Sequence, residues 1–279
     1  MTFSSAFPSI DAHVHLHPPR LARAIEHWFA GHGWTAGHSF DPDAVVDTLG
    51  ARGVRRFCFF SYAHKPGMAR ELNRWLSATA AAIPDAIALG TLHPDDPDLD
   101  AIAREATGDL GLRGFKFHHS VQRFGVDDPR LYGVYERAEA SGHVFVLHAG
   151  TMPYRDPFTG VEPFQRVMER FPRLRVSVAH MGAFQSAEFL ALLGRYPHLY
   201  VDTTMAMSPL ATRYVGGNPE SVTDADLVRH QDRVMFGSDF PLIPYDYDEE
   251  RRWAWERDLD DAVRRKIFHD NAFRFFGFD

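Results

Sequence analysis

The stretch PSIDAHVHLHP, residues 8–18, decides between the two folds that a chain of alternating strands and helices usually adopts. Residues 8–14 predict a short buried strand, and the stretch ends in histidines and a proline with no glycine. An open, doubly wound sheet usually carries a glycine-rich phosphate-binding turn after its first strand. The lack of such a turn favours a closed (β/α)8 barrel over the open sheet.

The rest of the chain repeats one pattern. Short apolar runs rich in β-branched and aromatic residues predict seven further strands near residues 54–60, 86–92, 113–118, 143–148, 174–180, 199–203 and 233–238. Apolar spacings of three and four predict helices over 67–82, 98–107, 129–141, 163–170, 185–195, 224–231 and 259–275. Eight strands that alternate with helices predict a single α/β TIM-barrel domain over residues 1–279. The helices of residues 247–279 are expected to pack on the barrel, with packing on a second copy of the chain as the alternative.

Composition excludes several classes of protein. The 279 residues carry a net charge of −7, which argues against a nucleic-acid groove or a basic membrane-binding surface. Hydrophobic residues make up 45% and charged residues 24%, so the chain is too apolar for a disordered protein. No apolar run approaches the ~18 residues that a membrane span requires. We therefore expect a small-molecule substrate, with no nucleic-acid or membrane partner.

The amino terminus and the cysteine content bear on the compartment. Residues 1–13 show no basic segment followed by an apolar one, so no secretory signal is expected. Cys58 is the one cysteine and cannot form an internal disulfide, so the cytoplasm is the expected location. Because Cys58 lies inside the second predicted strand, it is expected to be a buried, inert thiol.

Five ionisable side chains mark the ends of four predicted strands. His13 and His15 end the first strand, and residues two apart in a strand face the same way. His148 ends the fifth strand, His180 ends the sixth, and Asp239 follows the eighth. A barrel gathers the carboxyl ends of its strands around one mouth, where such folds place their active sites. We therefore expect these five groups to meet.

Imidazoles and a carboxylate form a nitrogen and oxygen ligand set. Such a set suits Zn²⁺, with Fe²⁺, Mn²⁺ and Co²⁺ as alternatives, and a single cysteine excludes a thiolate-rich site. A site that keeps an open position is catalytic, because water or substrate completes the coordination shell. Water bound there has a pKa near ~7 and becomes a nucleophile at neutral pH. The sequence predicts one divalent metal ion, with zinc as the first candidate.

The ordered motifs resemble a known family. They are DAHVH (11–15), GFKFH (114–118), LHAG (147–150), AHMG (179–182), FGSDFP (236–241) and NAFRFFG (271–277). Together they resemble the amidohydrolase superfamily, and more narrowly the branch that includes aminocarboxymuconate-semialdehyde decarboxylase. The resemblance extends from residue 10 to residue 277.

The resemblance implies a role for each strand-end residue. His13, His15, His148 and Asp239 would be metal ligands. In the hydrolase hypothesis Asp239 would also take a proton from the metal-bound water. His180 would stand beside the metal-bound water and orient or deprotonate it, or stabilise charge on the substrate. A role for His180 as a further ligand is the alternative.

Lys116 and His118 share one face of the fourth strand, and three interpretations stay open for Lys116. In some superfamily members the lysine is carboxylated and bridges two metals. In the decarboxylase-like branch the Lys-x-His pair usually accompanies a single metal, and the lysine makes charge contacts deeper in the barrel. A structural pairing with Asp11 or Asp202 is the third interpretation. We expect one metal, with Lys116 and His118 as substrate-binding residues.

Residues after the later strands are candidates to contact the substrate. The apolar candidates are Met152, Tyr154, Phe158, Phe184, Met205 and Met207. Such residues pack structurally as often as they line a pocket. The cationic candidates are Arg123, Arg155 and Arg213.

Two enzymatic functions and one binding function are consistent with these residues. The first is a metal-dependent hydrolase that directs an activated water at a small ester, lactone or amide. The alternative is non-oxidative decarboxylation of a small unsaturated or aromatic carboxylic acid, in which the metal binds substrate oxygens. The third is a metal-binding barrel without catalysis, which the retention of all five central groups disfavours.

Overall fold

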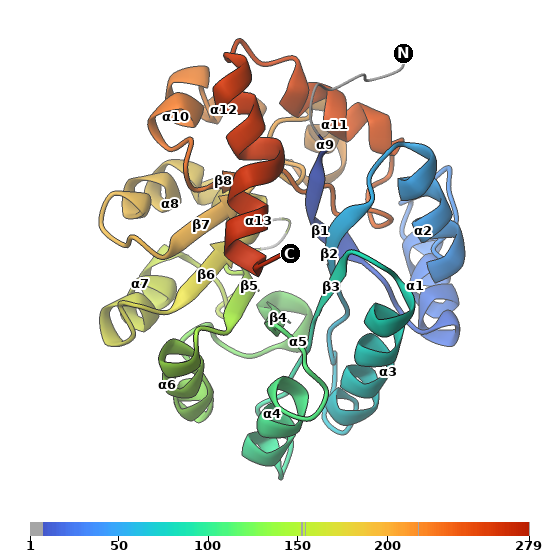
Figure 1. The fold of residues 1–279 in the computed structure, drawn as a ribbon, viewed down its shortest axis with the longest axis vertical. Coiled ribbons are helices and arrows are strands. Elements are labelled where there is room, and N and C mark those ends of the chain that lie inside the picture. Colours follow the sequence, from blue (N-terminus) through green and yellow to red (C-terminus); the bar gives the residue numbers. More distant parts are fainter. Residues whose placement is uncertain (1–7, 152, 154, 217, 279) are drawn as a thin grey trace.

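Eight parallel strands form a closed barrel, surrounded by helices (Figure 1). The computed structural model describes residues 8–278 except 152, 154 and 217. The strands are β1 (Ile10–His15), β2 (Arg56–Phe60), β3 (Ala86–Leu89), β4 (Gly114–His118), β5 (Val144–His148), β6 (Arg175–Val178), β7 (Leu199–Asp202) and β8 (Val234–Met235). The predicted TIM barrel is confirmed, and each observed strand falls on a predicted one.

Pairing follows the chain order around the ring. β1, β2 and β3 form one parallel sheet, and β4 to β8 form another in sequence order. Two bridges, Val14 with Phe240 and Gly90 with Phe115, join the sheets and close the barrel.

The helices form the outer layer and the closing segment (Figure 1). They are α1 (Pro19–Gly31), α2 (Pro42–Ala51), α3 (Ala69–Ala82), α4 (Leu99–Thr107), α5 (His119–Gln122), α6 (Tyr132–Ser141), α7 (Val161–Arg170), α8 (Ser186–Leu193), α9 (Pro209–Val215), α10 (Asp224–Arg229), α11 (Tyr247–Trp255), α12 (Asp261–Arg265) and α13 (Asn271–Phe276). Shorter helical turns are η1 (Pro129–Leu131), η2 (Ala179–Gln185), η3 (Pro219–Ser221) and η4 (Lys266–Asp270). No helix in the described ranges is long and apolar enough to cross a membrane.

The carboxyl-terminal helix fills the amino-terminal end of the barrel. In Figure 1 α13 crosses the ring of strands, and it contacts β1 and β8. Ala272, Phe275 and Phe276 pack against inward side chains of the strands, among them Ile10 and Val146. This packing leaves the opposite end, where the strands finish, for the polar side chains.

An irregularity in β1 sets the direction of its histidines. Ile10 pairs with Arg56 and Asp11 with Phe57, but Val14 pairs with Phe59, so one extra residue lies in β1. A bulge of this kind re-aims the side chains that follow it. Apolar side chains point inward below the bulge, and His13 and His15 point inward above it.

Two strands end earlier than the sequence suggests. β6 stops at Val178, because the next residues leave the extended conformation: His180 has φ 57°, Met181 51° and Ala183 58°. β8 contains only Val234 and Met235, although its predicted extent is 233–238.

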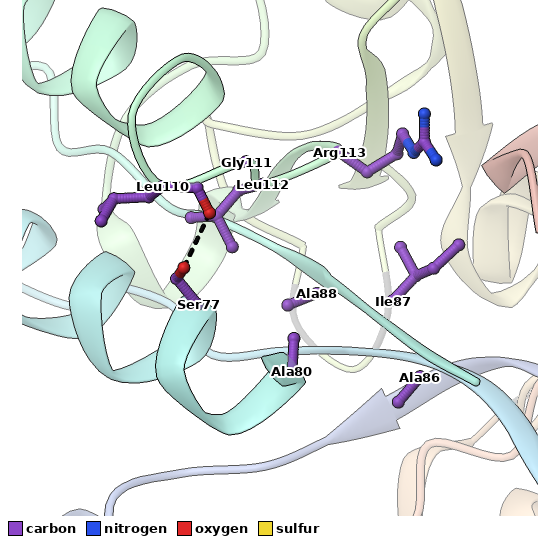
Figure 2. A pocket seen from close by; sticks show the side chains of 9 residues that line it. All are labelled: Ser77, Ala80, Ala86, Ile87, Ala88, Leu110, Gly111, Leu112 and Arg113. Atoms are coloured by element: carbon purple, nitrogen blue, oxygen red, sulfur yellow. Dashed lines mark hydrogen bonds between the residues drawn. The ribbon is translucent and has the colours of Figure 1, made fainter. Parts of the chain in front are cut away.

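A depression of about 130 Å³ lies between α3, β3 and the segment that precedes β4 (Figure 2). Ser77 and Ala80 of α3, the start of β3 and residues 110–113 line it. These residues precede or begin their strands, whereas His13 and Asp239 follow or end theirs. The depression is therefore separate from the polar group at the mouth.

Candidate functional site

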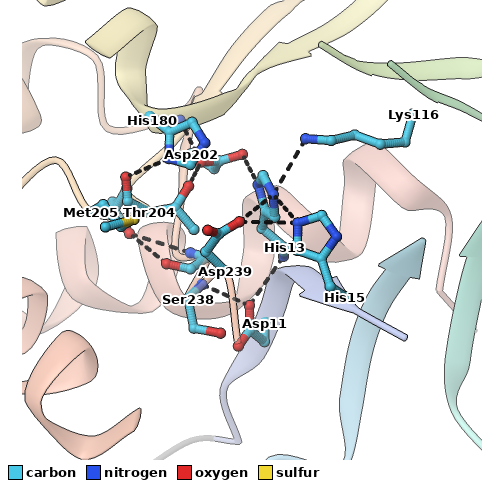
Figure 3. Close-up of polar contacts among 12 residues, drawn as sticks. Asp11, His13, His15, Lys116, His180, Asp202, Thr204, Met205, Ser238 and Asp239 are labelled. Atoms are coloured by element: carbon cyan, nitrogen blue, oxygen red, sulfur yellow. Dashed lines mark hydrogen bonds and ion pairs between the residues drawn. The ribbon is translucent and has the colours of Figure 1, made fainter. Parts of the chain in front are cut away.

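Three side chains from three strand ends converge at the mouth of the barrel (Figure 3). One ligand atom from each of His13, His180 and Asp239 lies within 4.8 Å of the others, and all three residues are buried. His15 joins them, because its Nε2 lies 3.0 Å from Asp239 Oδ1 and 3.3 Å from His13 Nε2. Asp239 has φ 62°, a conformation that costs free energy in a non-glycine residue and often marks functional sites.

Asp202 at the end of β7 supports two of these residues. Its Oδ2 accepts a hydrogen bond from His13 Nδ1 at 2.9 Å, and its Oδ1 accepts one from the His180 backbone N–H at 2.9 Å. Thr204 Oγ1 also donates to Oδ1. Because a carboxylate only accepts, the proton of His13 sits on Nδ1 and leaves Nε2 unprotonated beside Asp239.

His180 is held in the same tautomer by a different acceptor. Its Nδ1 donates to the carbonyl oxygen of Thr204 at 3.1 Å, so its Nε2 is unprotonated. Its ring centroid lies 5.4 Å from that of His13 and 4.7 Å from that of His148. The left-handed residues that follow β6 therefore place this imidazole among the other strand-end histidines.

Burial and hydrogen bonding shift the pKa values of these groups in different directions. Burial lowers the pKa of His15 to about 4 and that of His180 to about 4. Burial and Lys116 also lower the pKa of His13, but Asp202 and Asp239 outweigh them and leave it raised. Burial raises the pKa of Asp239, yet the adjacent imidazoles of His13 and His15 outweigh it and hold this pKa well below its usual range. Asp239 is therefore an ionised carboxylate at neutral pH.

A second buried carboxylate ties β1 to the segment after β8. Asp11 accepts hydrogen bonds from the backbone N–H of His13 at 3.0 Å, from that of Ser238 at 3.1 Å and from the Tyr247 hydroxyl at 3.1 Å. Burial raises the pKa of Asp11 to about 6. Asp11 thereby fixes the backbone that carries both His13 and Asp239.

Lys116 points across the barrel at β1. Its Nζ lies 3.3 Å from His13 Nε2 and 4.8 Å from the centroid of the Phe60 ring (Figure 3). The amine thus contacts His13, while Asp11 and Asp202 are occupied by other donors. Burial lowers the pKa of Lys116 to about 8.

His148 and His118 lie at the side of the group. Their rings stack with centroids 4.0 Å apart and planes 9° apart. His148 packs its ring against that of His180, whereas His15 makes a polar contact with the carboxylate of Asp239. The assignment of His148 as a ligand and of His180 as a group beside the ligands stays a prediction, as do the substrate-binding roles of Lys116 and His118.

Sequence reasoning missed two aromatic residues beside His15. His17 is buried, its Nδ1 lies 2.7 Å from Ser61 Oγ, and its ring is nearly parallel to that of His15. Tyr62 packs edge-on against His15, His17 and His118 at 5.8, 5.9 and 5.3 Å between centroids. The spacing of His13, His15 and His17, each two apart, is the signal that could have indicated His17. His17, Tyr62, His118 and His148 form a continuous set of planar side chains, here named the ring wall.

The residues predicted to contact the substrate lie in several different places. Met152 and Tyr154 lie outside the described residues. Met205 and Met207 are buried after β7. Two of the candidate cations lie over aromatic rings, Arg123 at 6.0 Å from the Phe158 centroid and Arg155 at 5.6 Å from that of Phe184, and Arg213 lies in α9.

The donor set fits a single divalent metal ion. His13 and His180 each keep an unprotonated Nε2, because Asp202 and the Thr204 carbonyl hold the protons on Nδ1. Asp239 supplies an ionised oxygen, and His15 brings a further neutral imidazole within 3.0 Å of that oxygen. Neutral imidazoles and a carboxylate are ligands for zinc and for related transition metals.

Comparisons with known proteins agree with the barrel fold. The chain is 24% identical to 2-amino-3-carboxymuconate-6-semialdehyde decarboxylase of Dictyostelium discoideum, over 97% of this chain and 92% of that protein. Among solved structures it is similar to an uncharacterised TIM-barrel protein of Bordetella bronchiseptica, with a TM-score of 0.71, 21% identity and coverage of 96% and 98% of the two chains. It is also similar to 5-carboxyvanillate decarboxylase of Novosphingobium aromaticivorans, solved with manganese and 4-hydroxy-3-methoxy-5-nitrobenzoic acid. There the TM-score is 0.66 at 16% identity, and 98% and 96% of the chains are covered.

The two solved structures are under 25% identical to this chain, so they support the fold. The family is shown by a different match, because the amidohydrolase family profile covers residues 10–278, nearly the whole chain. This match confirms the resemblance drawn from the motifs, and the chain belongs to the amidohydrolase family.

Proposed function

We propose that this protein is a metal-dependent, non-oxidative decarboxylase of a small aromatic or unsaturated carboxylic acid. Hydrolysis was the first expectation from the sequence. Two of the relatives reported above are named as decarboxylases, and this favours the alternative. The observation within the chain that carries the proposal is the ring wall beside the His13, His180 and Asp239 group.

The ring wall suits a flat substrate. Planar side chains pack well against a conjugated acid, because offset and edge-on ring contacts are favourable. His17 and His118 each keep a buried nitrogen, Nε2 and Nδ1 respectively, with no hydrogen-bond partner among the described residues. Such atoms can accept or donate a hydrogen bond to a hydroxyl or amino substituent. The wall therefore favours a planar substrate with polar substituents.

The residues of the three-member group have distinct tasks in this reaction. A divalent ion held by His13, His15 and Asp239 would supply positive charge for the oxygens of the substrate. Asp239 is ionised, so one of its oxygens can take a proton from the solvent and deliver it to the carbon that carries the carboxylate. The bond from that carbon to the carboxylate then breaks, its electron pair returns to the conjugated system, and CO₂ leaves. His180, unprotonated at Nε2, accepts a hydrogen bond from a substrate hydroxyl and so orients the ring.

The proposal is tested by following CO₂ directly. The purified protein is loaded with Zn²⁺ or Mn²⁺ and incubated with 5-carboxyvanillate, hydroxybenzoates and conjugated unsaturated acids labelled with ¹³C in the carboxylate. Release of ¹³C-bicarbonate is followed by NMR. The same samples are tested on lactones, aryl esters and amides with a pH indicator.

Two variants test whether CO₂ release depends on the site. Asp239→Asn should abolish CO₂ release, while Asp232→Asn should not, because Asp232 is a surface residue paired with Lys266. CO₂ release that requires metal and Asp239 supports the proposal. Metal-dependent hydrolysis of a lactone, ester or amide, with every acid unchanged, would overturn it in favour of the hydrolase.

A further inference from the structure

A buried glutamate from the carboxyl-terminal part of the chain contacts the segment after β7. Glu250 of α11 is 2% exposed. Its Oε1 accepts a hydrogen bond from the backbone N–H of Met205 at 2.6 Å, and its Oε2 accepts one from the Tyr245 hydroxyl at 2.6 Å. Burial raises the pKa of Glu250 to about 8, so ionising this carboxyl group inside the protein costs free energy. Carboxyl groups kept at such a cost are often functional.

The peptide that Glu250 binds is the same peptide that orients His180. The N–H of Met205 and the carbonyl of Thr204 belong to one planar unit. The Thr204 carbonyl oxygen accepts the hydrogen bond from His180 Nδ1 at 3.1 Å. In a trans peptide the N–H and the C=O point in opposite directions, so a bond to Glu250 on one side directs the carbonyl toward His180 on the other. Figure 3 shows Thr204 and Met205 beside His180.

The backbone at this peptide is in an unfavourable conformation. Met205 has φ 54°, in the left-handed region that non-glycine residues rarely adopt. Turning the 204–205 peptide over would return φ of Met205 to negative values and relieve this cost. The same rotation would turn the Thr204 carbonyl away from His180 and break the bond to Glu250. The hydrogen bond from Met205 to Glu250 therefore opposes the rotation.

We propose that Glu250 is a positioning residue that fixes the tautomer of His180 through the 204–205 peptide. With the carbonyl of Thr204 in place, His180 carries its proton on Nδ1 and presents an unprotonated Nε2 to His13 and Asp239. Without it, the proton can move to Nε2, and the nitrogen that faces the site becomes a donor. The consequence for turnover rests on the proposed function, whereas the consequence for the tautomer does not.

The tautomer is measured by NMR on the zinc-loaded protein with ¹⁵N-labelled histidine. The signals of His180 are those lost in His180→Asn. Glu250→Leu should convert His180 from the Nδ1–H form to a mixture of both forms. Glu250→Gln should keep the Nδ1–H form, because an amide oxygen can accept from Met205 and an amide N–H can donate to Tyr245. Glu249→Leu is the matched control, because Glu249 lies on the same helix at the surface, paired with Arg252.

A double-variant comparison tests the route of the effect. Glu250→Leu should lower kcat about tenfold with KM unchanged, the size expected when a residue behind a site residue is lost. In a His180→Asn background the same substitution should change kcat by less than about twofold, because the imidazole through which it acts is gone.

Each outcome bears on the proposal in a defined way. An unchanged Nδ1–H tautomer in Glu250→Leu, or an equal loss of kcat with and without His180, would overturn it and assign Glu250 to folding alone. If Glu250→Leu does not fold, Glu250→Asp, which is one methylene shorter, should show the same mixture of tautomers. If no substrate is turned over, the proposed function fails, and the NMR result still decides the role of Glu250.

Discussion

Asp202→Asn should weaken metal binding, although Asp202 is not a metal ligand in our interpretation. Asp202 Oδ1 accepts from the His180 N–H and from the Thr204 hydroxyl, and Oδ2 accepts from His13 Nδ1. An asparagine has one oxygen, which can keep the two donors at Oδ1. Its NH₂ group then faces His13 Nδ1 as a second donor. His13 can satisfy that contact only by moving its proton to Nε2, which removes the lone pair that would bind the metal.

The magnitude follows from the contact that is lost. Removing a partner behind a metal ligand typically lowers metal affinity about 10- to 100-fold. At about 1.4 kcal/mol for each factor of ten, this corresponds to roughly 1.4–2.8 kcal/mol. A hydrogen bond to a charged group contributes about 1.5–3 kcal/mol, so the two figures agree. The bond between His13 Nδ1 and Asp202, at 2.9 Å and fully buried, belongs to this class.

Metal affinity is measured by titrating metal-free protein with Zn²⁺ in competition with a chromophoric chelator. Circular dichroism checks that the variant is folded. Asp232→Asn makes the same chemical change at an exposed ion pair with Lys266 and should bind zinc like the wild type. A folded Asp202→Asn protein with wild-type zinc affinity would refute the reasoning, because His13 would then keep its tautomer without the carboxylate.

Four further predictions concern the metal, the proton transfer and the pH dependence. His13→Ala and His15→Ala should each lower metal content and activity together, measured by elemental analysis and turnover; wild-type metal in either would remove it from the ligand set. His180→Asn should keep most of the metal and cut turnover by roughly 10²–10⁴, and loss of metal equal to that in His13→Ala would make His180 a ligand. Asp239→Asn should keep part of the metal and lose turnover at every pH, and recovery at high pH would contradict its role in carrying the proton. Glu250, with its pKa raised from 4.5 to about 8, stabilises the fold fully below pH 4.5 and loses that contribution as pH rises to about 8. The midpoint temperature of thermal unfolding should therefore fall less for Glu250→Gln than for the wild type between pH 4.5 and pH 8. An equal fall in both proteins would contradict the prediction.

The sequence predicts the barrel and the meeting of its histidines for a simple reason. Buried parallel strands are short apolar runs, and the residue that ends each run lies at the mouth whatever the loops do. His13, His148 and Asp239 could therefore be placed at one end of the barrel before any contact was known. The alternation within β1 also predicted that His13 and His15 share a direction, and both contact Asp239 Oδ1.

The sequence could not predict features that depend on tertiary contacts. The bulge in β1 is visible only in its pairing with β2. The left-handed run that begins at His180 contains one glycine, which is too weak a sequence signal to predict it. Glu250 lies 45 residues from Met205 and belongs to a helix whose other acidic residues, such as Glu249, are at the surface. Its role as an acceptor becomes apparent only from its contact with the backbone of Met205, in the segment after β7.

The two histidines of the metal-fitting group show how one short segment can give identical side chains different chemistry. Asp202 and Thr204 lie two residues apart, and each accepts the Nδ1 proton of one imidazole. The acceptor for His13 is a carboxylate, whose negative charge raises the electron density on Nε2. The acceptor for His180 is a neutral carbonyl, and burial holds the pKa of this imidazole at about 4. His13 is thereby suited to bind a cation, and His180 is suited to stay neutral and accept a hydrogen bond from a substrate. When two groups of one type have pKa values pushed apart by their surroundings, they can take different roles in catalysis. In this interpretation the end of β7 and the residues after it supply no ligand of their own and assign those roles.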